Sequence, residues 1–104
     1  MISLHIDTRD NQKVMAKLDV DGEIFETQST NETRRPESII NLIDEVCKKA
    51  SITIHEVYEI NVEEGPGSYT GLKVGVSVAN ALSFALQKKV NGKQIGEITE
   101  PTYE

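Results

Sequence analysis

The sequence predicts an α/β (α+β) fold built on one five-stranded mixed sheet and two main helices, in the order β-β-β-α-β-α-β. Three segments near the start of the chain alternate apolar with polar residues, which is typical of half-buried strands. Two later segments, residues 36–50 and 70–88, carry apolar residues at helical spacing. A short apolar run separates these two segments, and another follows them. At 104 residues, the chain is long enough for one domain with one core.

The five strands are expected at residues 1–6, 13–20, 23–29, 57–62 and 90–98. Asp7 and Thr8 end the first strand, and a polar turn at residues 9–12 leads into the second. Asp21 and Gly22 are a two-residue hairpin signal of type I′, so the chain is expected to return directly into the third strand. The fifth strand is expected to be short and interrupted by glycines.

The first helix is expected to begin at Pro36, after a polar loop at residues 30–35. Proline suits the first turn of a helix, and Glu37 beside it favours the positive end of the helix dipole. The apolar stripe of this helix consists of Ile39, Ile43, Val46, Cys47 and Ala50. A connection at residues 51–56 then leads to the fourth strand, and His55 within it is interpreted as a solvated loop residue.

The second helix, at residues 70–88, is apolar around most of its circumference. A helix of this kind is buried on two sides. The sheet can cover one side, so the other side is expected to meet the first helix or another chain.

Composition and charge exclude several classes of protein. The formal net charge is −6, whereas surfaces that hold phosphate backbones are usually basic. The single cysteine, Cys47, cannot form an internal disulfide and is interpreted as a small core residue. No second His or Cys stands at metal-ligand spacing from His55, so no metal site or cofactor is expected. No apolar run approaches the roughly 20 residues of a membrane span. Since the N-terminus also lacks a signal-peptide pattern, we expect a cytoplasmic protein without membrane contact.

A glycine-rich stretch at residues 64–75 holds four of the chain's seven glycines. It lies between the fourth strand and the second helix, so it is predicted to be a strand-to-helix turn in which a Cβ would obstruct the backbone. Ser68 and Thr70 are both candidate N-caps, and the free amides beside them could hold an anion. The stretch has no Lys-Ser/Thr pair as in a P-loop, which favours tight strand-to-helix packing as the reason for its glycines.

Eleven residues of this turn carry a resemblance to a known family: Gly65-Pro66-Gly67-Ser68-Tyr69-Thr70-Gly71-Leu72-Lys73-Val74-Gly75. The motif and its strand–turn–helix context closely resemble the signature of the TsaB (YeaZ) family. Ile6-Asp7-Thr8 is similar to the end of that family's first strand, and residues 36–44 are similar to its first helix. Two positions differ from the family, because Arg9 replaces a small hydroxyl residue and Lys73 replaces an arginine. The order of elements, with an aspartate ending the first strand, is ribonuclease-H-like.

The resemblance implies an actin-like architecture in which residues 1–104 form a single N-terminal lobe and the family's second lobe is absent. In actin-like folds the nucleotide sits between two lobes. ATP, ADP or Mg²⁺ is therefore expected only at an interface that this chain shares with another. The residues expected to remain from an anion or nucleotide site are Asp7, Thr8, Gly67, Ser68 and Thr70.

The resemblance also implies a function, that of a non-catalytic scaffold subunit in making threonylcarbamoyladenosine. This modification lies next to the anticodon of tRNAs that read ANN codons. The implied partners are a TsaD-type catalytic subunit and a TsaE-type ATPase, with tRNA met only indirectly and a homodimer in isolation. The family's contacts are helical, so the expected interface residues are Ile40, Leu42, Val46, Val74, Val78, Ala81, Leu82 and Ala85.

Two alternatives to this function stay open. A ribonuclease-H-like nuclease would hold divalent metal ions with carboxylates at the ends of neighbouring strands, here Asp7 with Glu63 or Glu64. The acidic balance of the chain and the lack of a basic groove disfavour this reading. The other alternative is a truncated remnant that only associates with itself.

Overall fold

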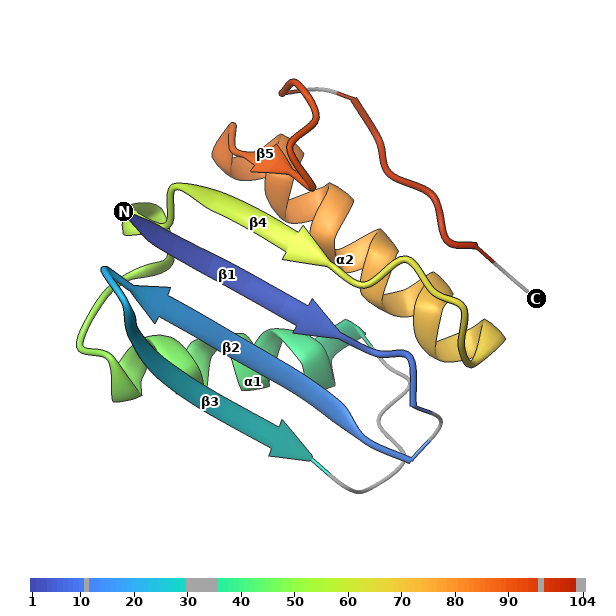
Figure 1. The fold of residues 1–104 in the computed structure, drawn as a ribbon, viewed down its shortest axis with the longest axis horizontal. Helices are drawn as coiled ribbons and strands as arrows, with labels where there is room; N and C mark the ends of the chain where they lie inside the picture. Colours follow the sequence, from blue (N-terminus) through green and yellow to red (C-terminus); the bar gives the residue numbers. More distant parts are fainter. Residues whose placement is uncertain (11, 30–35, 96, 103–104) are drawn as a thin grey trace.

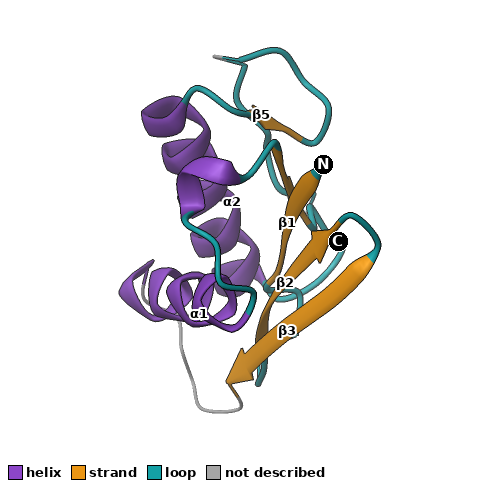
Figure 2. Ribbon diagram, turned by 90° about the vertical axis from the view of Figure 1, so that its left-hand side faces the viewer, coloured by secondary structure: helices purple, strands orange, loops and turns teal. Residues whose placement is uncertain are grey.

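The computed structural model describes residues 1–10, 12–29, 36–95 and 97–102. One five-stranded sheet, with strand order β3-β2-β1-β4-β5, forms one layer of the molecule. Two helices lie together on one face of the sheet as the second layer (Figure 1, Figure 2). The elements are β1 (Ile2–Asp7), β2 (Val14–Val20), β3 (Glu23–Ser29), α1 (Pro36–Lys49), a short 3₁₀ helix (Ile54–Glu56), β4 (Glu59–Val62), α2 (Tyr69–Leu86) and β5 (Lys89–Val90). This arrangement confirms the predicted mixed sheet with two main helices.

The first three strands form an antiparallel meander, in which β1 pairs with β2 and β2 pairs with β3. The predicted type I′ turn joins β2 to β3, because Asp21 and Gly22 have φ angles of 51° and 98°. The carboxylate of Asp19 accepts a hydrogen bond from the Gly22 amide and holds this turn. On the other side of the sheet, β4 runs parallel to β1 and β5 runs parallel to β4. The central strand β1 therefore ends at the same edge of the sheet as β4.

The hydrophobic core lies between the sheet and the two helices. α1 contacts β2 and β3, α2 contacts β1, β4 and β5, and the two helices contact each other. The core is formed by Leu4, Ile6, Val14, Ala16, Leu18, Ile39, Leu42, Ile43, Val46, Cys47, Val57, Ile60, Val62, Val76, Val78, Ala79 and Val90. The opposite face of β1 carries the partly buried polar residues Ser3, His5 and Asp7. Cys47 is buried as predicted, and burial raises the pKa of its thiol, so it packs as a core residue rather than a reactive thiol.

The fifth strand is shorter than predicted, because β5 covers only Lys89–Val90 instead of residues 90–98. Asn91 and Gly92 have left-handed φ angles of 51° and 74°. The Asn91 side chain also bonds the backbone of Val62, accepting from its N at 2.8 Å and donating to its O at 3.0 Å. These contacts turn the chain out of the sheet, so the prediction of a strand to residue 98 was wrong.

The connection between α1 and β4 also differs from the prediction. β4 begins at Glu59 rather than at residue 57, and a 3₁₀ helix at Ile54–Glu56 occupies part of the expected loop. His55 is exposed within this short helix, as a solvated residue. The predicted loop at residues 30–35 lies outside the described residues.

The two ends of α2 are set by Ser68 and Gln87. The Ser68 side chain accepts a hydrogen bond from the Gly71 amide at 3.3 Å, so Ser68 is the N-cap. Thr70 lies inside the first turn, and its prediction as a cap was wrong. Gln87 has a left-handed φ of 56° and ends the helix after Leu86, two residues earlier than predicted. In the part of the chain that the structure describes, neither helix is long and apolar enough to cross a membrane.

Candidate functional site

The glycine-rich turn joins the end of β4 to the start of α2. The peptide bond between Gly65 and Pro66 is cis, and Gly65 has a φ of 118°, which a side chain rarely adopts. The amide of Ser68 donates a 2.8 Å hydrogen bond to the carbonyl oxygen of Arg9. This bond ties the turn to the segment that follows β1, so the ends of β1 and β4 form one site.

Two glycines of α2 lie against Thr8 at the end of β1. A Cβ at Gly71 would come within 3.0 Å of the Thr8 carbonyl oxygen, and a Cβ at Gly75 would come within 3.0 Å of the Thr8 hydroxyl. Real side chains essentially never approach so closely. These glycines therefore allow α2 to lie directly against β1, which supports tight strand-to-helix packing as their role.

The predicted anion or nucleotide residues lie at the ends of β1 and β4 and the start of α2, and two of them already have side-chain partners within the chain. The Asp7 carboxylate is bonded by Arg9, and the Ser68 hydroxyl accepts from the helix. Thr8 is 1% exposed, and its Oγ1 has no hydrogen-bond partner among the described residues. A Cβ at Gly67 would lie 2.8 Å from the Cβ of Arg9, whereas Thr70 is exposed. Anion binding at this turn stays a prediction.

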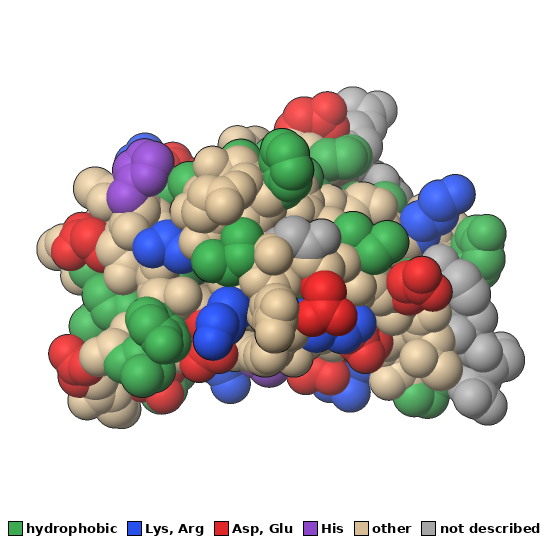
Figure 3. All heavy atoms as spheres, turned by 90° about the horizontal axis from the view of Figure 1, so that it is seen from above, with side chains coloured by type: hydrophobic (Ala, Val, Ile, Leu, Met, Phe, Trp, Pro, Cys, Tyr) green, Lys and Arg blue, Asp and Glu red, His purple; other side chains and the backbone are tan. Residues whose placement is uncertain are grey.

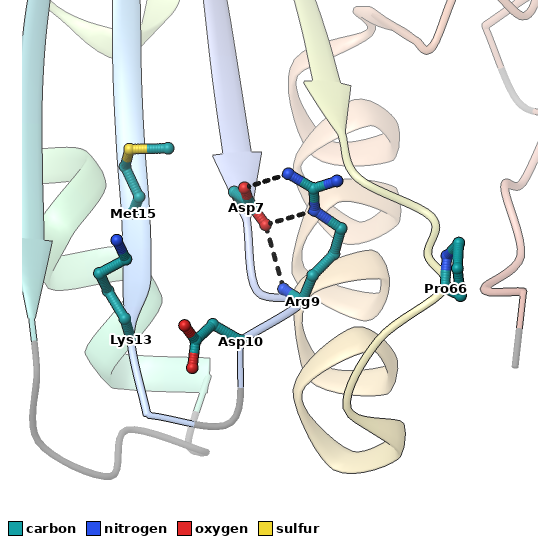
Figure 4. Close-up of a pocket in the computed structure, with 6 residues that line it drawn as sticks. All are labelled: Asp7, Arg9, Asp10, Lys13, Met15 and Pro66. Carbon is teal, nitrogen blue, oxygen red and sulfur yellow. Dashed lines mark hydrogen bonds and ion pairs between the residues drawn. The ribbon is translucent and has the colours of Figure 1, made fainter. Parts of the chain in front are cut away.

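A cluster of four charged or titratable residues occupies the shared edge of β1 and β4; we call it the strand-end cluster, and it comprises His5, Asp7, Arg9 and Glu63. Arg9 donates to Asp7 from its backbone N (3.1 Å), from Nε (3.1 Å) and from Nη2 (2.9 Å). Its Nη1 lies 3.7 Å from Oε1 of Glu63, and Nε2 of His5 lies 2.8 Å from Oε2 of Glu63. Figure 4 shows the Arg9 guanidinium turned back onto Asp7 at the end of β1. Arg9 therefore links the ends of the two strands.

Arg9 also controls the ionisation of Asp7. Burial of the Asp7 carboxyl raises its pKa, but hydrogen bonds from the side chain and backbone of Arg9, together with the charges of Arg9 and His5, outweigh this effect. The pKa of Asp7 is consequently lowered from its ordinary value of 3.8. The hydrogen bond and the charge of Asp7, with the charge of Glu63, in turn raise the pKa of Arg9. The cluster therefore holds Asp7 as an ionised carboxylate.

A pocket of about 370 Å³ opens beside the cluster, between the turn that follows β1 and the start of the glycine-rich turn (Figure 4). Its lining residues are Asp7, Arg9, Asp10, Lys13, Met15 and Pro66. Both signs of charge line it, so it presents no single charge to a ligand.

The geometry does not favour the metal site that a ribonuclease-H-like nuclease requires. Asp7 and Glu63 do lie in one cluster, but the guanidinium of Arg9 is between them. Glu64 points elsewhere, because its carboxylate accepts hydrogen bonds from Thr99 and, at 2.8 Å, from Asn91. Among the described residues, no group of three or more His, Cys, Asp or Glu side chains could hold a metal ion. Neither predicted pair of carboxylates therefore fits a divalent metal ion in this arrangement.

Residues 97–102, predicted as the end of a strand and a tail, return along α2 instead (Figure 1). The Asn80 side chain of α2 bonds both backbone groups of Thr99, donating to its O at 2.9 Å and accepting from its N at 2.9 Å. The Thr99 hydroxyl donates to the carboxylate of Glu64, and the Thr102 amide donates to the Glu64 carbonyl. The hydrogen bonds from Thr99 and Asn91 lower the pKa of Glu64 from 4.5. This segment therefore braces the glycine-rich turn from the side opposite Arg9.

The eight predicted interface residues divide into three groups. Leu42, Val46 and Val78 are 6%, 0% and 5% exposed, so they belong to the core of this chain and offer a partner no surface. Their assignment to an interface is corrected, because their helical positions face the sheet. Val74 and Leu82 are partly buried against the core, whereas Ile40, Ala81 and Ala85 are exposed.

The prediction missed Phe84, the most exposed large apolar residue of the described chain at 73%. Phe84 lies three residues after Ala81 and next to Ala85, so all three share the outer face of α2. The signal in the sequence was an aromatic residue on the polar stripe that also carries Lys73 and Ser77. We call Ala81, Phe84 and Ala85 the α2 patch.

Charged residues of both signs are mixed over the side of the molecule seen in Figure 3. There, Lys and Arg side chains lie among Asp and Glu side chains instead of gathering into a broad basic area. This side consequently lacks the basic surface that a phosphate backbone requires.

Comparison with known proteins gives a consistent set of relatives. Residues 30–92, more than half of the chain, match the model of the family described as "TsaD: tRNA N6-adenosine threonylcarbamoyltransferase". The chain is 43% identical over 67 residues to a tRNA N6-adenosine threonylcarbamoyltransferase from Ralstonia pickettii, which covers 64% of this chain. It is 35% identical over 46 residues to the tRNA threonylcarbamoyladenosine biosynthesis protein TsaB from Haemophilus influenzae, which covers 44% of this chain. These alignments span only 18% and 20% of the relatives' own lengths.

A solved structure shares the fold. YeaZ from Pseudomonas aeruginosa superposes with a TM-score of 0.79 at 22% identity, over 86% of this chain and 43% of that chain. At this identity the similarity shows that the two proteins share a fold.

Proposed function

The chain belongs to the tRNA N6-adenosine threonylcarbamoyltransferase family, and on this basis we propose that it serves the synthesis of threonylcarbamoyladenosine on tRNA. Its role in this proposal is that of a non-catalytic subunit that binds a TsaD-type catalytic subunit. Relatives in the family carry the name of the transferase or of the biosynthesis protein TsaB. The alignments span 18% and 20% of these two relatives' own lengths.

One observation carries the proposal: the outer face of α2 is exposed although it bears apolar side chains. Phe84 is 73% exposed, and Ala81 and Ala85 lie beside it without cover from the rest of the described chain. Exposed aromatic residues surrounded by small ones are typical of interface centres, because the small residues allow a second helix to approach closely.

The neighbouring helix extends this surface. Ile40 on α1 is 48% exposed, and α1 lies in the same layer as α2 (Figure 2). A partner that packs on the helical layer could therefore bury Ile40 together with the α2 patch. The sheet's other face is polar around β1 and is less suited to such a contact.

The strand-end cluster supports a non-catalytic role. Its two carboxylates are engaged by Arg9 and His5, so neither is free to act as a general base or to bind a metal ion in this arrangement. In this proposal the partner carries the chemistry of the pathway. A TsaE-type ATPase and tRNA would join through that partner.

Binding to the TsaD-type subunit of the same organism tests this proposal. Size-exclusion chromatography with light scattering should show a stable heterodimer when the two proteins are mixed. Phe84→Glu places a charge in the centre of the α2 patch and should weaken the complex by about tenfold or more. Ile24→Glu is the matched control, because Ile24 is 52% exposed on β3, away from the helices, and its substitution should leave affinity unchanged.

Three results would contradict the proposal. A chain that stays monomeric with the partner present excludes a subunit role. A homodimer that never exchanges with the partner supports the self-associating remnant instead. If Ile24→Glu and Phe84→Glu weaken affinity for the partner equally, the contact does not lie on the α2 patch.

A further inference from the structure

Arg9 contacts both carboxylates at the ends of β1 and β4. We propose that Arg9 is a built-in cation: its guanidinium occupies the place between Asp7 and Glu63 that a divalent metal ion would need, and it closes this edge of the sheet to metals. This inference is independent of partner binding by α2, because the strand-end cluster and the α2 patch have no residue in common.

Each of the four carboxylate oxygens of Asp7 and Glu63 already faces a hydrogen-bond or ion-pair partner. Oδ1 of Asp7 accepts from the backbone N and Nε of Arg9, and Oδ2 accepts from Nη2. Oε1 of Glu63 faces Nη1 of Arg9 at 3.7 Å, and Oε2 faces His5 at 2.8 Å. A metal ion would have to displace these partners before it gained any ligand.

Arg9 is held in this position at both ends. Its carbonyl oxygen accepts the 2.8 Å hydrogen bond from the Ser68 amide, so the glycine-rich turn fixes its backbone. Its guanidinium is fixed by the two parallel bonds to Asp7, a geometry that a planar fork forms and an ammonium group does not. The guanidinium therefore cannot swing away without losing its two hydrogen bonds to Asp7.

The chemistry of arginine makes this closure permanent across the ordinary pH range. A guanidinium stays protonated in proteins, and the contacts with Asp7 and Glu63 raise the pKa of Arg9 further. A histidine in this place could lose its proton near neutral pH and admit a metal ion. The strand ends thus keep the carboxylates typical of metal-dependent enzymes while the metal's charge is supplied by the chain itself.

Titration with Mn²⁺, followed by the loss of its free-ion electron paramagnetic resonance signal, tests the proposal. The wild type should bind no Mn²⁺ at the cluster. Arg9→Gln removes the cation and should raise Mn²⁺ affinity by at least about tenfold. Asp7→Asn in the Arg9→Gln background should abolish this binding. Lys48→Gln is the charge-matched control, because Lys48 lies on α1 and its nearest carboxylate, Asp44, is 3.0 Å away on the same helix.

Each remaining outcome overturns the proposal. Mn²⁺ binding by the wild type, removed by Asp7→Asn, shows that Arg9 does not close the site. A folded Arg9→Gln variant that binds no Mn²⁺ shows that Arg9 does not occupy a cation's place. An equal gain in Lys48→Gln assigns the effect to net charge. Circular dichroism establishes that each variant is folded. Arg9→Lys is a second variant, which keeps a positive charge and should still exclude the metal. Mn²⁺ binding by Arg9→Lys that equals binding by Arg9→Gln also overturns the proposal.

Discussion

Thr8 sets how closely α2 approaches the sheet. Its carbonyl oxygen lies against Gly71, and its hydroxyl lies against Gly75, four residues further along the helix. The side chain is almost completely buried, and its Oγ1 finds no hydrogen-bond partner among the described residues. An unpaired buried hydroxyl is normally unfavourable, so the close packing of strand and helix must outweigh its cost.

This contact predicts different outcomes for two glycine substitutions. Alanine is usually about 1 kcal/mol better than glycine inside a helix. Here Gly71→Ala and Gly75→Ala should each destabilise the protein by about 1–3 kcal/mol, because the new methyl group collides with Thr8. Thr8→Ala should rescue Gly75→Ala, which meets the Thr8 side chain, but not Gly71→Ala, which meets the Thr8 backbone.

Urea unfolding of the single and double variants measures this difference as a coupling free energy. Rescue of both glycine variants, or of neither, would contradict the assignment of side chain to Gly75 and backbone to Gly71.

At this scale, most features that depend on local signals were predicted, apart from the Thr70 cap, whereas long-range pairings were not. The Asp21-Gly22 turn and the Ser68 cap depend on neighbours within three residues, and both were predicted. The roles of Arg9 and Glu64 depend on partners far along the chain, such as Glu63 for Arg9 and Thr99 for Glu64. No local pattern in the sequence encodes those pairings.

α2 and the segment at residues 97–102 form the least expected pair of elements. Asn80 pairs with both backbone groups of Thr99 in the way that one strand pairs with another, although residues 97–102 form no strand. Thr99 is 2% exposed and also bonds Glu64. The segment is thereby fastened both to the helix and to the turn before it.

Asn80→Ala should release this segment without unfolding α2. The Thr99 amide donates to the Asn80 side chain, so its hydrogen exchange should quicken by about tenfold or more when that acceptor is lost. Amide exchange followed by NMR measures this directly. Asn41→Ala, at an exposed position of α1, is the control and should leave the Thr99 amide unchanged. Unchanged exchange in Asn80→Ala as well would show that other contacts hold the segment.

The helices and first three strands were predicted well because each carries its own periodicity. β5 was not, because its end is decided by the contact between the Asn91 side chain and Val62. Three of the eight predicted interface residues, Leu42, Val46 and Val78, were misplaced for a related reason. On a helix that is apolar on most sides, periodicity cannot tell which apolar face meets the sheet, so Val78 was expected at a surface and lies in the core.

Over the whole molecule, the resemblance to the TsaB (YeaZ) family is confirmed by the family match, by relatives named TsaB and by the YeaZ fold. The eleven-residue motif carried this resemblance. Its glycines Gly71 and Gly75 are needed where α2 packs against β1, so the motif reports on the fold. The motif could not reveal what the surface binds. Exposure of Phe84 became visible only when both helices were placed on one face of the sheet.

The stability of the molecule should fall in acid. The pKa values of Asp7 and Glu64 are lowered in the folded protein from ordinary values of 3.8 and 4.5. Groups with lowered folded pKa values contribute stability that is fully present above the ordinary pKa and is lost as the pH falls through the folded pKa. The free energy of unfolding should therefore be nearly constant above about pH 5 and decline below about pH 4.

Urea unfolding at constant ionic strength across this range checks the prediction. Asp7→Asn and Glu64→Gln should each flatten the acid decline, because each removes one of the two groups. Stability that rises as the pH falls below 3.8 would contradict the sign of both shifts.

The contact of Thr8 with Gly71 and Gly75 also fixes the position of α2 along its own axis. A helix that slides by one turn moves about 5.4 Å. In one direction, such a slide would bring the methyl group of Ala79 to the place where Gly75 meets the Thr8 hydroxyl. In the other direction it would draw the Ser68 cap past the end of β1. α2 is consequently fixed along its own axis relative to β1, so a slide of the helix past the strand is blocked by its own side chains.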